Sequence, residues 1–128
     1  MSNIPWSHKS KVLLVDDNEL TIELLKRRLI SIGCDVLTCS NSFLVLDKIK
    51  EHRPDILVLD LYMPGKSGFE VAREVKSDKA SEGISIIAYS SAIMVEDSNR
   101  AIEAGCDDFC SKEANLRVLM RKIKNLVG

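Results

Sequence analysis

Six polar side chains in this sequence stand at the ends of apolar runs and could act together as one chemical site. They are three acids, two hydroxyls and one amine: Asp16, Asp17, Asp60, Ser90, Ser91 and Lys112. Carboxylates bind hard cations and can attack phosphorus, whereas hydroxyls and an amine can bind phosphoryl oxygens. The residue types indicate metal-assisted phosphoryl chemistry, provided that the fold brings them together.

The apolar runs predict the strands that position these side chains. ILVL at 56–59 ends in Asp60, and Pro64 and Gly65 follow, as is typical of a strand buried on both faces of a parallel sheet. Four other strands are expected at 11–17, 35–39, 84–91 and 107–111. Amphipathic patterns predict helices between and after them, at about 18–32, 42–52, 67–76, 96–104 and 114–127.

Strict alternation of strands and helices predicts an α/β fold, a doubly wound five-stranded parallel sheet with five helices. The carboxyl ends of its strands share one edge, where such folds bind ligands. The predicted caps are Asn18 or Asp17 for the first helix and Ser67 for the third. In the second helix, Phe43 is expected to face inward with Leu46 and Ile49.

Charge repulsion at this edge predicts a bound cation. Two carboxylates about 4 Å apart repel each other by ~4 kcal/mol at an effective dielectric constant of 20. Lys112 alone cannot neutralise three acids, and an all-oxygen ligand set favours Mg²⁺. Asp60 could then attack a phosphoryl group to form an acyl phosphate, with Lys112 and the Ser90 hydroxyl binding its oxygens. The alternative is that Asp16 or Asp17 only caps a helix.

Length and composition are those of one globular domain: 128 residues, 45% apolar and 29% charged, with a formal net charge of −1. This charge balance gives no reason to expect direct nucleic-acid binding, and no apolar run is long enough for a membrane span. A cytoplasmic location is therefore expected. The four cysteines are expected to be reduced thiols, with zinc or a disulfide as the alternative, because their spacings do not match a usual zinc site.

Four motifs, in order, resemble those of the response-regulator receiver domains of two-component signalling, in particular the stand-alone chemotaxis type. They are LLVDDNE, DLYMPGKSG around Asp60, IIAYSSA around Ser90, and FCSK ending in Lys112. The resemblance covers residues 11–127 and implies the flavodoxin-like receiver fold. Residues 1–10 are then expected to form an N-terminal arm and 11–128 the receiver domain.

The resemblance also implies roles at the site. Asp60 would be the phosphoacceptor, and Lys112 would bind the phosphate. Asp16, Asp17, Asp60 and the backbone carbonyl of Tyr62 would hold Mg²⁺. The phosphoryl donor would be a sensor histidine kinase or a histidine phosphotransfer protein.

The resemblance further implies that signal output depends on two residues. Ser90 would be the switch hydroxyl, and Phe109 would be the switch aromatic. Phosphorylation would draw the Ser90 hydroxyl toward the phosphate and turn the Phe109 ring. The alternative for Phe109 is ordinary packing in the core. The surface of the fourth helix, fifth strand and fifth helix would then change its binding to a separate downstream protein, with no direct contact to nucleic acid or membrane. Such a protein catalyses only its own phosphorylation and dephosphorylation and is not otherwise an enzyme.

Two positions depart from the family pattern, and both are expected, together with Ser91, to modulate the site. Glu113 stands where receiver domains usually have a cis proline. Because a non-proline cis bond costs ~3–4 kcal/mol, the Lys112–Glu113 bond is expected to be trans with a shifted loop, or else cis and retained for function. Tyr62, two residues after the acceptor, either screens an acyl phosphate from water or simply faces solvent.

Other functions would require different residues at this edge of the sheet. An aspartate-nucleophile phosphatase needs a general acid or base at the place of Tyr62. A flavodoxin-like electron carrier needs a phosphate-binding first loop, which Asp16 and Asp17 would repel. A phosphorylation-independent docking module and a receiver fragment of a larger hybrid kinase stay open as alternatives.

Overall fold

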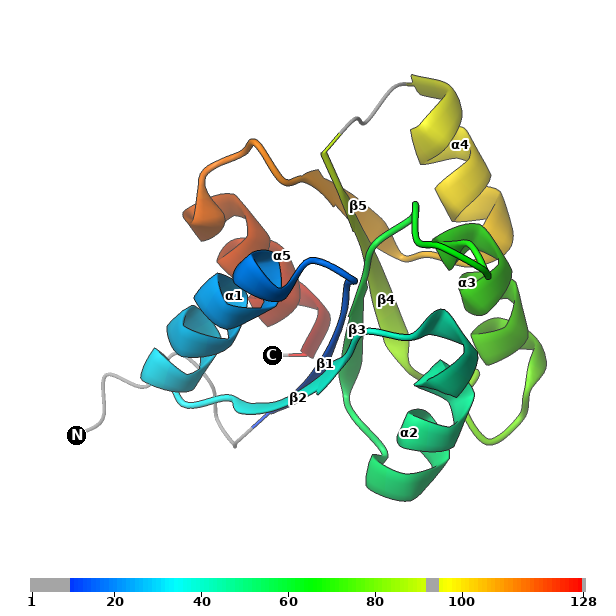
Figure 1. The fold of residues 1–128 in the computed structure, drawn as a ribbon, viewed down its shortest axis with the longest axis horizontal. Helices are drawn as coiled ribbons and strands as arrows, with labels where there is room; N and C mark the ends of the chain where they lie inside the picture. The colour runs from blue at the N-terminus through cyan, green and yellow to red at the C-terminus, as the bar shows by residue number, and fades with distance from the viewer. Residues whose placement is uncertain (1–9, 92–94, 128) are drawn as a thin grey trace.

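The computed structural model of the protein describes residues 10–91 and 95–127. Its five strands form one parallel sheet in the order β2-β1-β3-β4-β5 (Figure 1). The strands are β1 Lys11–Val15, β2 Asp35–Cys39, β3 Ile56–Leu59, β4 Ser85–Ser90 and β5 Asp108–Ser111. The expected N-terminal arm lies outside the described residues except for Ser10, which is buried.

Five helices cover the sheet, α1 and α5 on one face and α2, α3 and α4 on the other (Figure 1). They are α1 Glu19–Ser31, α2 Val45–His52, α3 Gly68–Ser77, α4 Val95–Ala104 and α5 Leu116–Val127. The predicted doubly wound α/β fold is confirmed. Among the described residues, no helix is both long and apolar enough to cross a membrane.

The core explains why the strands are apolar without alternation. Leu13, Leu57 and Ile86 pack toward α2, α3 and α4. Their neighbours Leu14, Val58 and Ile87 pack toward α1 and α5. Because successive side chains in a strand point to opposite faces, a sheet covered on both sides requires apolar residues at every position.

Capping side chains set where two of the helices begin. Asn18, rather than Asp17, caps α1, and its side-chain oxygen accepts a hydrogen bond from Thr21 N at 3.0 Å. Ser67 and Glu70 form a capping box at the start of α3, as expected for Ser67. The helix α1 therefore begins soon after β1, whereas the longer segment 60–67 separates β3 from α3.

The prediction for the second helix was wrong at its start. Ser42–Leu44 forms a 3₁₀ turn, η1, which Asn41 caps, and the α-helix begins only at Val45. Successive residues turn through a larger angle about the axis in a 3₁₀ helix than in an α-helix. The Phe43 side chain therefore does not lie on the apolar face that the α-helical pattern predicts. The Phe43 side chain is 61% exposed and lies over Gly65, with Lys66 Nζ 5.2 Å from the ring centroid.

All four cysteines are free and buried, which confirms the expectation of reduced thiols used as small apolar residues. Burial raises the pKa of Cys34 to about 11 and that of Cys106 to about 12. Removing a thiol from water disfavours its charged form, which is the reactive one.

Cys106 is therefore predicted to be inert toward alkylation in the native protein. At pH 8, a thiol with a pKa of about 12 is ionised to roughly one part in ten thousand. Iodoacetamide in native buffer should leave Cys106 unlabelled, as detected by mass spectrometry. The control is treatment in urea at a denaturing concentration of about 8 M, which should label Cys106 fully. Rapid labelling of Cys106 in buffer would contradict the prediction.

Candidate functional site

Three carboxylates meet at the carboxyl ends of β1 and β3, which are neighbours in the sheet. Asp16, Asp17 and Asp60 each offer an oxygen, and these oxygens all lie within 4.8 Å of one another. Asp16 and Asp60 are buried, whereas Asp17 is exposed. The fold thus brings together the three acids that the sequence places at strand ends.

Lys112 reaches the same cluster from the loop after β5. Its Nζ lies 2.7 Å from Asp16 Oδ2 and 3.4 Å from Asp60 Oδ2. Its backbone N–H donates to the carbonyl of Ser90 at 2.9 Å, which ties the loop to the end of β4. Burial alone would lower the pKa of Lys112, but the hydrogen bonds and charges of Asp16 and Asp60 outweigh burial and raise it. The amine is therefore charged and belongs to the site.

The Asp60 carboxylate is only partly compensated by its surroundings. Burial raises its pKa, and the charge of Asp16 raises it further. The backbone N–H of Tyr62, 3.2 Å from Asp60 Oδ1, and the Lys112 amine act in the opposite direction without reversing the shift. Additional positive charge beside Asp60 would favour its ionised form.

The donor set fits a hard divalent cation. Three carboxylates face one ammonium group, which leaves two formal negative charges uncompensated. Asp16 is held through both oxygens: Oδ1 accepts from Asn18 N at 2.9 Å, and Oδ2 lies 2.7 Å from the Lys112 amine. The remaining negative charge of the cluster favours a further cationic ligand. The acidic cluster could therefore bind a metal through oxygen atoms only.

The predicted switch residues lie on the two neighbouring strands. Ser90 ends β4, is 2% exposed and pairs in register with Ser111 of β5, whereas Ser91 is exposed. Phe109 on β5 is half-buried and packs against the apolar cluster on the α2, α3 and α4 side of the sheet. These positions are compatible with switching, and the switch roles of Ser90 and Phe109 stay predictions.

The loop after Lys112 takes the first of its two predicted forms. No peptide bond among the described residues is cis, so Lys112–Glu113 is trans. Ser111 shapes the turn instead: its hydroxyl accepts from Glu113 N, and its carbonyl accepts from Ala114 N, both at 3.1 Å. The Glu113 side chain is exposed.

Tyr62 does more than face solvent, although its side chain is 49% exposed. Its hydroxyl donates a hydrogen bond to Asp97 Oδ1 of α4, and this bond raises the pKa of Tyr62. Its ring lies edge-on to that of Phe69, with centroids 5.8 Å apart and an interplanar angle of 78°. Sequence reasoning missed Asp97, because nothing in the helical pattern of α4 pairs it with a loop residue 35 positions earlier.

Gly68 is a second residue that the sequence reasoning missed. At this first residue of α3, an added Cβ would lie 2.2 Å from the carbonyl oxygen of Asp60 and 2.6 Å from Leu61 Cα. The Gly68 N–H donates to the Leu61 carbonyl at 2.9 Å. A glycine at the first helical position, directly after a serine cap, was the available signal for such a close backbone approach.

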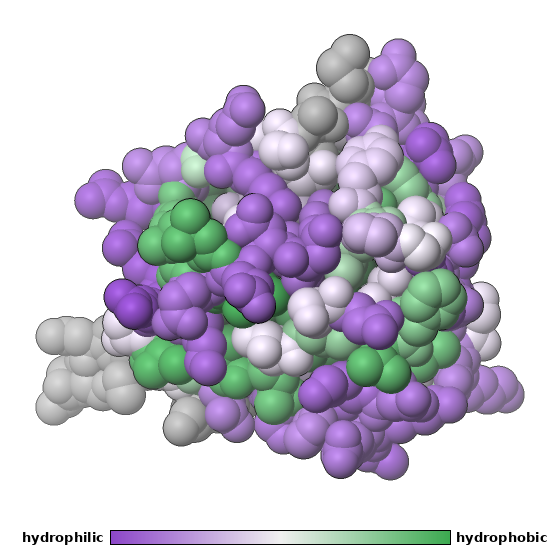
Figure 2. Space-filling model, viewed as in Figure 1, coloured by the Kyte–Doolittle hydropathy of each residue, from purple (hydrophilic) through white to green (hydrophobic). Residues whose placement is uncertain are grey.

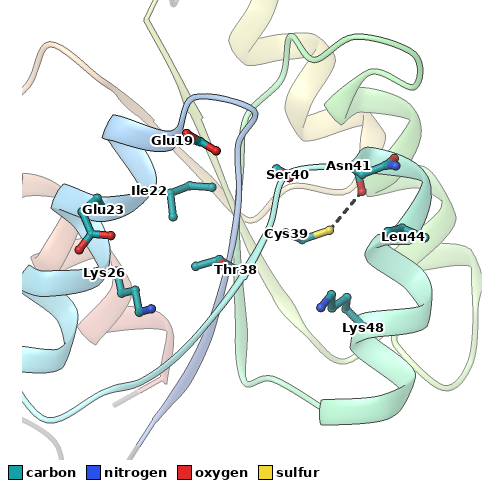
Figure 3. A pocket seen from close by; sticks show the side chains of 10 residues that line it. All are labelled: Glu19, Ile22, Glu23, Lys26, Thr38, Cys39, Ser40, Asn41, Leu44 and Lys48. Carbon is teal, nitrogen blue, oxygen red and sulfur yellow. Dashed lines mark hydrogen bonds between the residues drawn. The ribbon is translucent and has the colours of Figure 1, made fainter.

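One surface hollow reaches the acid cluster, and a second lies farther along β2. The first is lined by Asp17, Ser40, Asn41, Phe43, Pro64 and Gly65, so it reaches the exposed acid of the cluster. The other, of about 500 Å³, lies along β2 between α1 and α2 (Figure 3). Charged side chains of both helices and Thr38 line it, and Cys39 donates to the carbonyl of Asn41 at its upper end. None of Asp16, Asp17 and Asp60 lines this second hollow.

Known proteins match almost the whole chain. A family model for the response regulator receiver domain matches residues 12–124. The polar-differentiation response regulator DivK of Brucella anthropi is 32% identical over 117 residues, which are 91% of this chain and 95% of DivK. The chemotaxis response regulator CheY4 of Vibrio cholerae has the same fold, with a TM-score of 0.86 at 23% identity over 93% of this chain and 99% of CheY4. A signal receiver domain of a histidine kinase from Syntrophus aciditrophicus matches with a TM-score of 0.85 at 27% identity, over 92% of this chain and 89% of that one.

Gly68→Ala is predicted to destabilise the protein by about 3 kcal/mol, because the new methyl group would overlap the backbone of Asp60 and cannot be accommodated by a side-chain rotation. Urea unfolding measures the effect. Gly83→Ala is the matched control, since no atom lies within 4 Å of the Cβ that it would add, and it should change stability by less than about 0.5 kcal/mol. Equal stability of the two variants would contradict the prediction.

Proposed function

The chain belongs to the response regulator receiver domain family, whose members are signalling switches, and we propose that its Asp60 accepts a phosphoryl group from a phosphohistidine. The observation that carries the proposal is the convergence of Asp16, Asp17 and Asp60 with Lys112 at one sheet edge. Phosphorylation on aspartate is typical of the family. The donor would be a sensor histidine kinase or a histidine phosphotransfer protein.

Each group at the site would have a separate role in phosphoryl transfer. Mg²⁺, held by Asp16, Asp17, Asp60 and the Tyr62 carbonyl, would neutralise the charge that builds up between carboxylate and phosphoryl oxygens. An oxygen of Asp60 forms the new bond to phosphorus while the phosphorus–nitrogen bond of the donor breaks and its electron pair returns to the imidazole. The Tyr62 N–H holds Asp60 Oδ1 during this step, and Lys112 exchanges its contact with Asp60 Oδ2 for a phosphoryl oxygen.

The proposed docking site for the donor is the exposed apolar surface of α1. Leu20 and Leu24 are 70% and 56% exposed. A hollow lined by Leu24, Leu25 and Lys112, among others, connects this surface with the site. Figure 2 shows hydrophobic side chains gathered on the α1 side of the molecule, with hydrophilic residues beside them. Exposed apolar patches with polar rims are typical of protein–protein contacts, which suits a helical kinase or phosphotransfer domain.

The proposed output is a change in the surface formed by α4, β5 and α5. The Ser90 hydroxyl, at the end of β4, would bind a third phosphoryl oxygen, and Phe109 on β5 would turn into the space that it leaves. The pairing of Ser90 with Ser111 supports this, because it connects the end of β4 directly to β5. Ile102, 52% exposed on α4, offers an apolar contact for a separate downstream protein.

The phosphoacceptor assignment predicts one modified residue. With Mg²⁺ and a small phosphodonor such as acetyl phosphate, mass spectrometry should find a single added phosphoryl group on Asp60, and chelation of the metal should prevent its addition. Asp60→Asn should gain none, whereas Asp47→Asn, a change of an exposed acid on α2, should behave as the wild type. Modification of Asp60→Asn to the wild-type extent would disprove the assignment.

Tyr62 is predicted to prolong the life of the acyl phosphate. Its side chain is anchored on both Phe69 and Asp97 beside the acceptor, where it hinders the approach of water. Tyr62→Asn removes this screen, so its aspartyl phosphate should decay several-fold faster than that of the wild type. Decay is followed by loss of label after removal of the phosphodonor, and identical rates would rule out a screening role.

A further inference from the structure

Tyr62 forms hydrogen bonds both with the acceptor and with α4. Its backbone N–H donates to Asp60 Oδ1 at 3.2 Å, and its hydroxyl donates to Asp97 Oδ1 in the first turn of α4. One residue therefore connects the acceptor carboxylate to a helix that the described contacts do not otherwise join to Asp60. In Figure 1 the segment that leaves β3 runs close to α3 and α4.

The described side chains of α4, at positions 96–104, give the helix little apolar anchorage, which gives weight to this polar contact. Of the α4 side chains that the structure describes, only Asp97, Ala101 and Ala104 are buried. By contrast, α3 buries Phe69, Val71, Ala72 and Val75. Hydrophobic stabilisation scales with the apolar area that is buried, so two alanine methyl groups hold a helix much less firmly than the α3 set.

A second polar contact reinforces the same junction. The Arg100 guanidinium of α4 lies 4.0 Å from the centroid of the Phe69 ring, and the Tyr62 ring meets Phe69 edge-on. Phe69 thus lies between a cation of α4 and the loop tyrosine. The attachment of α4 depends on how Tyr62 is placed, because Tyr62 contacts both Phe69 and Asp97.

We propose that Asp97 is a positioning residue that holds Tyr62 beside the acceptor, and that the Tyr62–Asp97 pair is a latch that ties α4 to the loop after Asp60. The regulatory part of this inference rests on the proposed function. An acyl phosphate oxygen is a weaker hydrogen-bond acceptor than a carboxylate oxygen, because the charge of the carboxylate is lost. Loading Asp60 would therefore loosen the Tyr62 N–H bond, and the latch would pass that change to α4.

Native-state hydrogen exchange of the α4 amides in protein without a phosphodonor tests the latch. Tyr62→Phe keeps the ring and removes the hydroxyl, and Asp97→Ala removes the acceptor. Each should speed α4 exchange by about ten-fold, the effect of losing one hydrogen bond to a charged group. Asp97→Asn keeps an acceptor oxygen for the tyrosine and should restore most of the protection.

Two comparisons separate the latch from a general effect on the helix. Glu96→Ala removes an exposed acid from the same first turn, so it reproduces the loss of charge at the helix N-terminus and should change α4 exchange less than two-fold (about the size expected of a surface change). If Asp97 acts through the Tyr62 hydroxyl, the Tyr62→Phe, Asp97→Ala double variant should exchange no faster than either single variant. The proposal would be overturned if the rate increases of the two single variants multiply in the double variant. It would also be overturned if neither single variant changes the exchange rate of the α4 amides.

The decay of phosphorylated protein then tests the regulatory part. Tyr62→Phe and Asp97→Ala should each shorten the aspartyl phosphate lifetime, and the double variant should shorten it no further; independent effects on lifetime would overturn the positioning role of Asp97. Failure of Asp60 to accept any phosphoryl group would instead defeat the proposed function. The two failures are distinguishable, because the exchange measurement uses unphosphorylated protein.

Discussion

Mutual repulsion among Asp16, Asp17 and Asp60 is the constraint on which the rest of the structure depends. Their oxygens lie within 4.8 Å of one another, and two of the three side chains are buried. Among the described residues, Lys112 is the cationic side chain that forms ion pairs with them. Such a cluster costs folding free energy unless positive charge compensates it. The proposed binding of a cation together with a phosphoryl group would offset this cost.

The scaffold holds this cluster in place by close backbone packing rather than by side chains alone. Asp60 follows a strand that is buried on both faces, and Gly68 brings the start of α3 into contact with the Asp60 backbone. Lys112 is held by the bond between its backbone N–H and the Ser90 carbonyl. Catalytic geometry needs such rigid support, because small displacements of reacting groups cost large factors in rate.

The helix α4 is built differently. Its described buried face consists of two alanines and an aspartate, and its contacts with Tyr62 and Phe69 are polar or cationic. Contacts of this kind break more easily than a packed apolar face, and elements that move in signalling are drawn from the less stable parts of a fold. A firmly held Asp60 beside a lightly held α4 suits the proposed conversion of a local charge change into a movement.

The sequence by itself determined the fold class, the order of the strands and helices along the chain, and the convergence of the acids with Lys112. Unbroken apolar runs such as Ile56–Leu59 require a sheet covered on both faces, and parallel strands deliver Asp16, Asp17, Asp60 and Lys112 to one edge whatever the details of packing. Only the tertiary structure decided the outward placement of Phe43, the backbone contact that requires Gly68, and the pairing of Tyr62 with Asp97. The first depends on the phase of a 3₁₀ turn, the second on how closely two backbones approach, and the third on which face of α4 meets a distant loop. The periodicity of the local sequence predicts none of these.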